Sequence, residues 1–207
     1  MIQKNEEYIV DIIDNGINGE GIAKINNFTI FVKEAIKGEK VKIHILKVNS
    51  NFAYAKIIEI ISASNERRNP FCSAYKMCGG CNLQYMSYEE TLRVKQNYIK
   101  NTLQKALPNY NFFIEKSDID NDNLNKGDNS IEIKLPIGMI KPKNYRNKVQ
   151  YPVRNGKIGF YKDRTHEIIE NEYCFIQDEN IDKLSKKAFE LLIKFGNTCY
   201  DEVSKKR

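Results

Sequence analysis

The sequence predicts an α+β protein in two parts, a small β-barrel over residues 1–62 and a mixed α+β domain over residues 63–207. Three observations support this division. Short β-rich runs broken by glycine fill the first part, apolar residues at helical spacing mark helices in the second, and three cysteines lie just after the boundary. A chain of 207 residues is long enough for two modest domains, since domains commonly contain about 100 to 150 residues.

The first part alternates between strand-forming runs and turn residues. The runs are Tyr8–Ile13, Phe28–Val32, Val41–Val48 and Ala53–Ile61. In the third run the apolar positions alternate with Lys40, Lys42 and His44. Because successive side chains of a strand point to opposite faces, we expect one basic wall of the barrel to face solvent.

Two helices are expected in the second part. Ser87-Tyr88-Glu89-Glu90 has the S-x-x-E form of a capping box, and apolar residues follow at near-helical spacing until Pro108. A second amphipathic helix runs from Ile181 to Phe195 and should end at Gly196, which suits a left-handed cap.

Strand and loop signals fill the remainder. Residues 115–130 are rich in Asp, Asn and Ser and are expected to form a flexible loop before a strand over 131–135. Asn155-Gly156 indicates a hairpin between Lys148–Val153 and Lys157–Tyr161, with a further strand at His166–Ile169.

We expect the protein to be cytoplasmic and monomeric. No run approaches the roughly 18 apolar residues of a membrane span, and the first residues lack the apolar core of a signal peptide. The 33 Lys and Arg against 27 Asp and Glu give a net charge of +6, and the excess is concentrated in residues 139–164. This distribution favours an anionic partner.

The cysteine cluster is the strongest chemical signal. Cys72, Cys78 and Cys81 lie within ten residues, with Gly79 and Gly80 expected to let the backbone curl through conformations that residues with a Cβ avoid. Soft thiolates suit an iron–sulfur cluster or zinc, and buried or redox thiols are a third interpretation. A fourth ligand could come from Cys174 or Cys199.

Cys72-x5-Cys78-Gly-Gly-Cys81-Asn-Leu-Gln-Tyr resembles the iron–sulfur motif of the RNA 5-methyluridine (uracil-5-) methyltransferases, in particular the 23S rRNA branch. Residues 1–62 also resemble that family's TRAM domain, an OB-type β-barrel, through Asn18–Ala23 and Gly38–Val41. The resemblance implies a [4Fe–4S] cluster in an iron–sulfur and central domain over 63–207. Its ligands would be Cys72, Cys78, Cys81 and, in Glu-Tyr-Cys-Phe-Ile, Cys174. Cys199 would be a spare thiol, and zinc is the competing metal.

The resemblance implies the RNA-recognition and iron–sulfur portion of an S-adenosylmethionine-dependent 23S rRNA methyltransferase. No cofactor loop, nucleophilic cysteine or carboxylate base is identifiable, so we assign no catalytic residue, and S-adenosylmethionine is expected only in a full-length enzyme. Whether this chain is itself an enzyme is left open, and a separately encoded catalytic domain could be its partner. The cluster is expected to serve folding and RNA positioning. Alternatives are a stand-alone RNA-binding or iron-sensing module, or the matching part of a tRNA uracil-5-methyltransferase.

Two surfaces are candidates for RNA contact. In the barrel, Phe52 and Tyr54 lie among lysines and could stack on bases. The second is a cationic run, expected as a strand with Arg146, Lys148 and Gln150 on one face, whose contact residues would be Lys141, Lys143, Arg146, Lys148 and Arg154. A plain folding module and a solvated edge strand are the respective alternatives.

Overall fold

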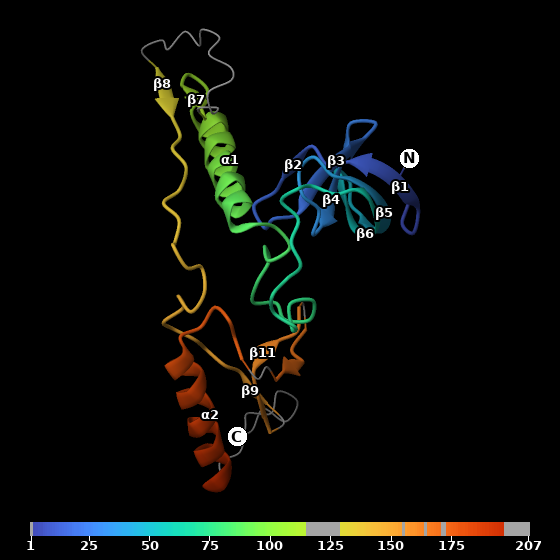
Figure 1. Ribbon diagram of the computed structural model, residues 1–207. Helices are drawn as coiled ribbons and strands as arrows, with labels where there is room; N and C mark the ends of the chain where they lie inside the picture. Colours follow the sequence, from blue (N-terminus) through green and yellow to red (C-terminus); the bar gives the residue numbers. More distant parts are fainter. Residues whose placement is uncertain (1, 115–128, 155, 164, 171–172, 197–207) are drawn as a thin grey trace. The chain divides into compact units, whose positions relative to one another are not determined.

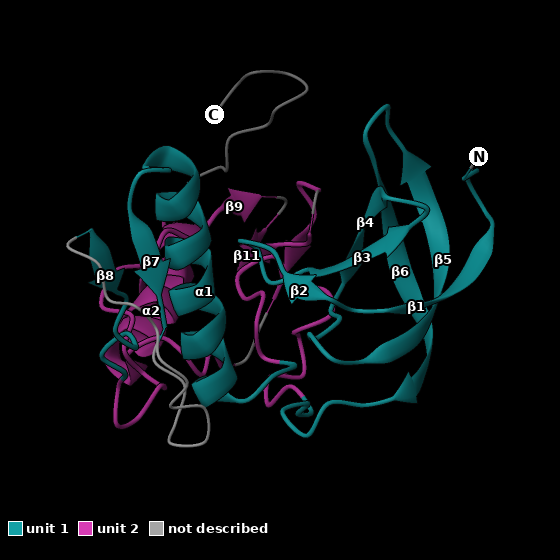
Figure 2. Ribbon diagram, turned by 90° about the horizontal axis from the view of Figure 1, so that it is seen from above, with its two compact units in different colours: residues 1–69, 85–138 teal, residues 70–84, 139–207 magenta. Residues whose placement is uncertain are grey.

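The structure is a computed structural model that describes residues 2–114, 129–154, 156–163, 165–170 and 173–196 (Figure 1). The chain divides into two compact units, which Figure 2 distinguishes by colour. Unit 1 comprises residues 1–69 and 85–138, and unit 2 comprises residues 70–84 and 139–207. These units are defined by contacts within the structure and not by independent folding. The domain boundary that the sequence places at residue 62 therefore stays a prediction.

The elements occur in the chain as β1 (Glu7–Asp11), β2 (Asp14–Asn15), β3 (Gly21–Ile25), β4 (Phe28–Lys33), β5 (Lys40–Val48), β6 (Phe52–Ser62), α1 (Tyr88–Ala106), β7 (Asn111–Phe113), β8 (Ser130–Glu132), β9 (Val153–Arg154), β10 (Lys157–Ile158), β11 (Phe160–Tyr161), β12 (Ile168–Ile169) and α2 (Glu179–Lys194). The chain is therefore mixed α and β, as the sequence predicts.

The first six strands form one sheet in the order β1-β5-β6-β4-β3-β2, in which β4 and β6 run parallel and the other neighbours antiparallel. Alternate residues face a common core, as the period-two pattern predicts. The fully or almost fully buried core members of the three central strands are Ile30, Val32, Val41, Ile43, Ile45, Ala53 and Ala55. The opposite positions, including Lys40, Lys42 and His44, lie on the outer face.

The expectation of a closed barrel is wrong for the described strands. The ladder ends at β1 on one side and at β2 on the other, and these two strands do not pair. The Ile13 N–H donates to the Ile22 carbonyl at 2.8 Å, which links the chain after β1 to β3 without forming a ladder. The physical reason is the shortness of β2, which contains two residues before the turn at Gly16 and Gly19.

The helix predicted after Ser87 is confirmed, but only half of its capping box forms. The Ser87 hydroxyl accepts the Glu90 N–H at 3.1 Å. The Glu90 carboxylate pairs with Arg93 at 2.6 Å instead, and the Ser87 N–H donates to the Glu66 carbonyl. Glu66 therefore replaces the expected reciprocal cap and ties the start of α1 to the segment that follows the sheet.

The segment after α1 pairs β7 with β8 in parallel. The strand expected over 131–135 is thus found at Ser130–Glu132. The loop expected over 115–130 lies almost wholly outside the described residues.

Unit 2 contains two small hairpins and α2. The hairpin predicted at Asn155-Gly156 is confirmed by the β9–β10 pair, with Gly156 at φ +69°. Residue 155 itself is not described. The strand expected at His166–Ile169 is found as β12, which pairs with β11. The predicted second helix is α2, and Gly196 follows it at φ +69°, as expected of a left-handed cap.

The strand expected through Arg146, Lys148 and Gln150 is wrong. The structure has one isolated bridge there, between Arg146 and Gln177, and regular pairing begins at β9. Packing overrides the strand pattern, because the Tyr151 hydroxyl donates to Gln177 Oε1 at 2.6 Å beside Asp182 of α2. Burial and the Asp182 charge raise the pKa of Tyr151 to about 12, so its hydroxyl stays protonated as a donor at neutral pH.

Within the part of the chain that the structure describes, neither α1 nor α2 combines the length and the apolar character that a membrane span needs.

A buried ion pair fastens the sheet of unit 1 to the segment that follows it. Glu39 is fully buried, and its two carboxylate oxygens accept from the Arg67 Nε and Nη2 atoms, each at 2.6 Å. The backbone N–H groups of Ile36 and Ser64 also donate to Glu39. Burial by itself raises the pKa of Glu39, but these hydrogen bonds and the Arg67 charge outweigh it and hold the pKa below its ordinary 4.5.

We predict that Glu39→Gln destabilises the protein by about 3 kcal/mol at neutral pH, because it leaves the Arg67 guanidinium without its charged partner. A depressed folded-state pKa means that the carboxylate contributes its full stability above 4.5 and loses it as pH falls through the folded pKa. The difference in denaturation midpoint between parent and variant should therefore shrink on acidification. The exposed Glu59→Gln is the control and should change little, and a pH-independent difference would contradict the prediction.

Candidate functional site

Four cysteine side chains of unit 2 line one small cavity, here named the thiol cavity. They are Cys72, Cys78, Cys81 and Cys174, and all four are half-buried free thiols. The cavity wall also includes Tyr75, Gly80, Gln84, Arg146, Phe160, Phe175 and Ile176. The structure thus brings together the four cysteines that the resemblance selects. Cys199 lies outside the described residues.

Local turns place the first three thiols. The Tyr75 N–H donates to the Cys72 carbonyl at 3.1 Å, and the Cys78 N–H to the Ala74 carbonyl at 2.8 Å, so this stretch coils much like one turn of helix. The Tyr75 hydroxyl donates to the Asn82 carbonyl at 2.9 Å. The Gln84 side chain accepts the Cys72 N–H at 3.3 Å. These bonds close the segment on itself.

The two glycines of the motif act differently from the expectation. Neither takes a positive φ, so the predicted need for conformations closed to other residues is wrong. Gly80 matters through close approach instead: a Cβ built there would lie 3.3 Å from Cys78 Sγ, and its N–H donates to that sulfur at 3.4 Å. A side chain at this position would intrude on the thiol cavity.

Backbone pairing delivers Cys174 to the same cavity. Residues 144–146 run alongside residues 175–178, because the Asn144 N–H donates to the Phe175 carbonyl at 3.0 Å and the Arg146 N–H to the Ile176 carbonyl at 2.8 Å. The Gly79 N–H bonds to the Tyr161 carbonyl at 3.2 Å. The cysteine turn is thereby fixed against the later part of unit 2.

Two of the thiols, Cys78 and Cys81, are favoured in their neutral form. Burial raises the pKa of the Cys78 thiol, and nearby Cys174 and Cys72 raise it further, against the Gly80 N–H and the Arg146 charge. Burial also raises the pKa of Cys81, which a hydrogen bond with the Gln84 side chain partly offsets. Sequence reasoning missed Gln84, although it lies in the Asn-Leu-Gln-Tyr stretch that carries the resemblance.

Among the described residues, no three His, Cys, Asp or Glu side chains are arranged to hold a metal ion.

Aromatic rings flank the cysteines. Phe71 and Phe175, each beside a cysteine in sequence, meet edge to face with centroids 5.6 Å apart, and Tyr173 meets Phe175 at 5.0 Å. The Lys143 ammonium lies 5.0 Å from the Phe71 ring centroid. Lys143 was expected to contact RNA, and here its charge lies over these rings.

The other cations of the run are placed separately. Lys141 and Lys148 are exposed, whereas Arg146 is half-buried at the thiol cavity. Arg154 lies in β9 and lines a second pocket.

The outer face of the unit 1 sheet carries a cluster of three rings, here named the aromatic face. Phe31, Phe52 and Tyr54 have centroids 5.4 to 5.8 Å apart. They project outward because Ile30 and Ala53 in the same strands are buried. Phe52 is half-buried, and Tyr54 is 39% exposed.

Basic residues border these rings. Lys47 pairs with Tyr54 in register, and Lys33 and His44 both pair with Lys56. Rings and cations on one solvated face are the combination that single-stranded nucleic acid binds.

The family comparison identifies this sheet, since residues 3–58 match the TRAM domain. These residues are a TRAM domain. Its core is the buried face of the sheet, and the aromatic face is its solvated side.

Relatives match nearly the whole chain. An uncharacterized RNA methyltransferase of Clostridium acetobutylicum is 44% identical over an alignment of 209 positions, which covers 99% of this chain and 42% of the relative. An uncharacterized RNA methyltransferase of Clostridium tetani is 43% identical, and the match covers 97% of this chain and 40% of the relative. The chain therefore spans about two fifths of the length of these curated relatives.

A solved structure shares the fold beyond the TRAM domain. The Pyrococcus abyssi tRNA (uracil-54, C5)-methyltransferase, solved with S-adenosyl-L-homocysteine, matches with a TM-score of 0.54 at 14% identity. The match covers 95% of this chain and 40% of that one.

Proposed function

We propose that this chain is the RNA-recognition and iron–sulfur portion of an S-adenosylmethionine-dependent RNA uracil-5-methyltransferase. The observation that carries the proposal is the 44% identity over 99% of the chain to a relative named as an RNA methyltransferase. The Pyrococcus abyssi enzyme, whose title names uracil C5 as its target, supports the uracil-5 class at the level of fold.

The thiol cavity is proposed to hold a [4Fe–4S] cluster through Cys72, Cys78, Cys81 and Cys174. Four thiolates and no nitrogen or oxygen ligand form a donor set that suits iron–sulfur clusters or zinc. Zinc requires all its sulfur ligands within about 2.3 Å of one ion. In a cubane cluster each thiolate binds a different iron, so four thiols that line one cavity could each supply one ligand.

The cluster's proposed role is structural. It would join the turn of residues 72–81 to Cys174, which lies far along the chain, and so close a long loop. Arg146 would offset part of the negative charge of the four thiolates, because its positive charge lowers the pKa of Cys78 whereas burial raises it. Methyl transfer from S-adenosylmethionine to uracil C5 requires no electron transfer, so no redox role is needed.

RNA contact is proposed at two surfaces. The aromatic face of the TRAM domain would stack bases on Phe52 and Tyr54, with the neighbouring lysines near the phosphates. In the other unit, the exposed Lys141 and Lys148 would contact phosphates. Arg146 is better assigned to the thiol cavity, where the structure places it.

The methyltransferase chemistry is proposed to require a catalytic domain that this chain does not supply. Apolar residues on α2 support an additional packing partner, since Leu184 is 68% and Phe195, its cap, 74% exposed. We favour 23S rRNA as substrate, on the resemblance of the cysteine motif. tRNA is the second candidate, because the solved structure that shares the fold is named as a tRNA enzyme.

We predict that anaerobically purified protein is brown and contains about four iron and four sulfide per chain, as a [4Fe–4S] site requires. Cys174→Ser should reduce the iron content and the visible absorbance as severely as Cys78→Ser. Cys199→Ser is the matched control and should leave both unchanged. Stoichiometric zinc without visible absorption, or a requirement for Cys199 in place of Cys174, would overturn the ligand assignment.

We predict that this chain, incubated with S-adenosylmethionine and 23S rRNA, forms no 5-methyluridine, because no nucleophile, base or cofactor loop is identifiable in it. The measurement is nucleoside analysis of the digested RNA by mass spectrometry. Adding the catalytic portion of a relative should produce methylation. Methyl transfer by this chain alone would refute the proposal, and binding without any gain from the added portion would favour a stand-alone RNA-binding module.

We predict that the two RNA surfaces respond differently to substitution. Lys141→Gln with Lys148→Gln should weaken binding to an rRNA fragment and make the log–log salt slope shallower by about 0.7 to 0.9 per charge. Tyr54→Ala should cost about 1–3 kcal/mol of binding free energy with the slope nearly unchanged, as loss of base stacking implies.

Two controls accompany this measurement. Tyr110→Ala removes a ring of similar exposure (40%) outside the TRAM domain, and Lys187→Gln removes an exposed charge from α2. Both should bind like the parent. If correctly folded variants of both surfaces also bind like the parent, these surfaces do not contact RNA.

A further inference from the structure

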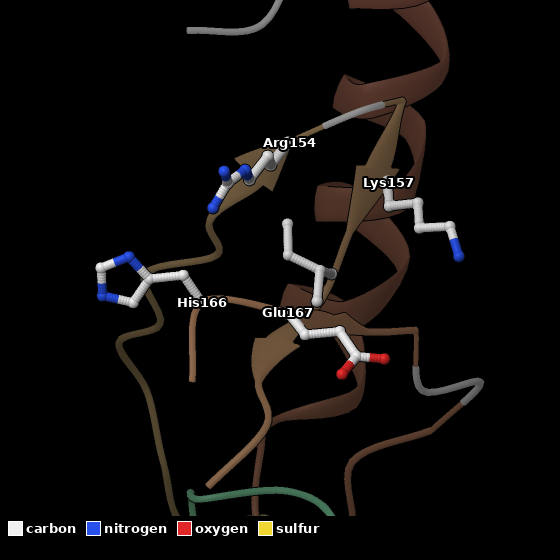
Figure 3. A pocket seen from close by; sticks show the side chains of 5 residues that line it. Arg154, Lys157, His166 and Glu167 are labelled. Carbon is white, nitrogen blue, oxygen red and sulfur yellow. The ribbon is translucent and has the colours of Figure 1, made fainter. Parts of the chain in front are cut away.

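A second pocket of unit 2 lies on the two hairpins, and we name it the hairpin pocket (Figure 3). Its volume is about 410 Å³, and its lining consists of Arg154, Lys157, His166, Glu167 and Ile168. Pockets that bind small molecules commonly measure about 300 to 1,000 Å³, so a nucleotide unit could fit. Figure 3 shows the Arg154 and His166 side chains extending to the same side of the pocket, with Lys157 on the other.

The backbone under this pocket is closely packed. At Gly159, immediately before β11, a Cβ would lie 2.0 Å from the Ile169 carbonyl oxygen, so only glycine permits this approach of β11 to β12. The Lys162 N–H donates to the Glu167 carbonyl at 2.9 Å, which closes the hairpin below its turn. Ile168 is 9% exposed and forms an apolar wall. The lining side chains therefore project from a defined scaffold.

The charges of the pocket favour an anion. Glu167 pairs with Lys162 at 3.0 Å, and Lys157 lies 3.5 Å from Glu170. Exposed pairs of this kind contribute only about 0 to 1 kcal/mol, so a bound phosphate can compete with them at small cost. Arg154 adds a permanent positive charge, and a guanidinium can donate two parallel hydrogen bonds to a phosphate.

An aromatic surface lies beside this charge. The His166 ring stacks on Tyr161 with centroids 5.2 Å apart and planes at 29°. Tyr161 is 39% exposed, and His166 is exposed as well. Proteins that recognise unpaired RNA bases stack them on aromatic side chains and hold the adjoining phosphate with cations. The hairpin pocket presents its cations and the His166 ring, and Tyr161 stacks on that ring from outside the lining.

We propose that the hairpin pocket binds one nucleotide of single-stranded RNA, with its phosphate at Arg154 and its base against the stacked His166 and Tyr161 rings. The inference rests on the proposed RNA-binding function. It adds to that function a contact site that involves neither the TRAM domain nor the exposed Lys141 and Lys148. Lys157, on the opposite wall, would meet the next phosphate of the strand.

The chain's two histidines make the test direct. His166 lines the hairpin pocket, and His44 lies on the outer face of the TRAM sheet, in register with Lys56. With ring-labelled histidine, the imidazole C–H resonances of the full chain report on the two surfaces separately. His44→Gln and His166→Gln assign the two signals. The probe is a short oligouridylate, compared with the same concentration of inorganic phosphate.

We expect both signals to move with the oligonucleotide, and the His166 signal to move little with inorganic phosphate. Movement of the His44 signal alone contradicts RNA binding at the hairpin pocket and supports RNA binding at the TRAM surface. No movement of either signal rejects RNA binding at both the hairpin pocket and the TRAM surface. Movement of His166 alone upholds the pocket and rejects the TRAM surface. If inorganic phosphate reproduces the His166 shift with equal affinity, the pocket is a free-anion site and base stacking is refuted.

Substitutions give a second readout by fluorescence anisotropy. Arg154→Gln should lower oligonucleotide affinity about tenfold and make the salt slope shallower by about 0.7, as loss of a charged phosphate contact implies. His166→Ala should lower affinity at least about fivefold with an unchanged slope, because stacking carries no net charge. Lys187→Gln should match the parent. Parent-like affinity of both pocket variants, with unchanged melting temperature, would overturn the proposal.

Discussion

The meeting of the cysteine turn with the segment around Cys174 is the constraint on which unit 2 depends. Residues 70–84 and 139–207 are separated by the whole of α1 and the β7–β8 pair, yet they form one compact unit. Backbone bonds from Gly79 to Tyr161 and between residues 144–146 and 175–178 hold them together. Without these bonds Cys174 would not reach the other three thiols, so the thiol cavity and the fold of unit 2 are one feature. A cluster that used these thiols would reinforce bonds that the backbone already makes.

The packing of unit 2 also places the cations of the run over residues 141–154 in different surroundings. Its residues are not equivalent positions on one strand, because their backbones follow different partners. Arg146 is drawn beside Cys174 by its bonds to Ile176, Lys143 lies over Phe71, and Arg154 reaches a different pocket. A stretch with one sign of charge thereby serves a thiol site, an aromatic contact and a second, anion-favouring pocket. Net charge alone indicates an anionic partner but not which cation meets it.

In the TRAM domain, strand alternation separates the buried core from the face that we propose binds RNA. Its inward residues are small aliphatic side chains at almost zero exposure, and its outward residues include the aromatic face and its lysines. The buried Glu39–Arg67 pair adds a polar anchor at the edge of this core, tying the sheet to the chain that leads to α1. Variants of the outer face should therefore leave the fold intact, which makes binding measurements on them interpretable.

The sequence by itself determined the elements whose signals are local. Period-two alternation predicted the sheet strands, Ser87 predicted the start of α1, and Gly156 and Gly196 predicted a hairpin turn and a helix end. Tertiary structure decided what depends on partners distant in sequence. The sheet stays open because β1 and the two-residue β2, the strands at its two edges, do not pair. A strand did not form at Arg146 because Tyr151 packs on Gln177. Gln84 and His166 gained neighbours that no local pattern encodes. Backbone conformation is set within a few residues, whereas a site is assembled by packing between segments far apart in the chain.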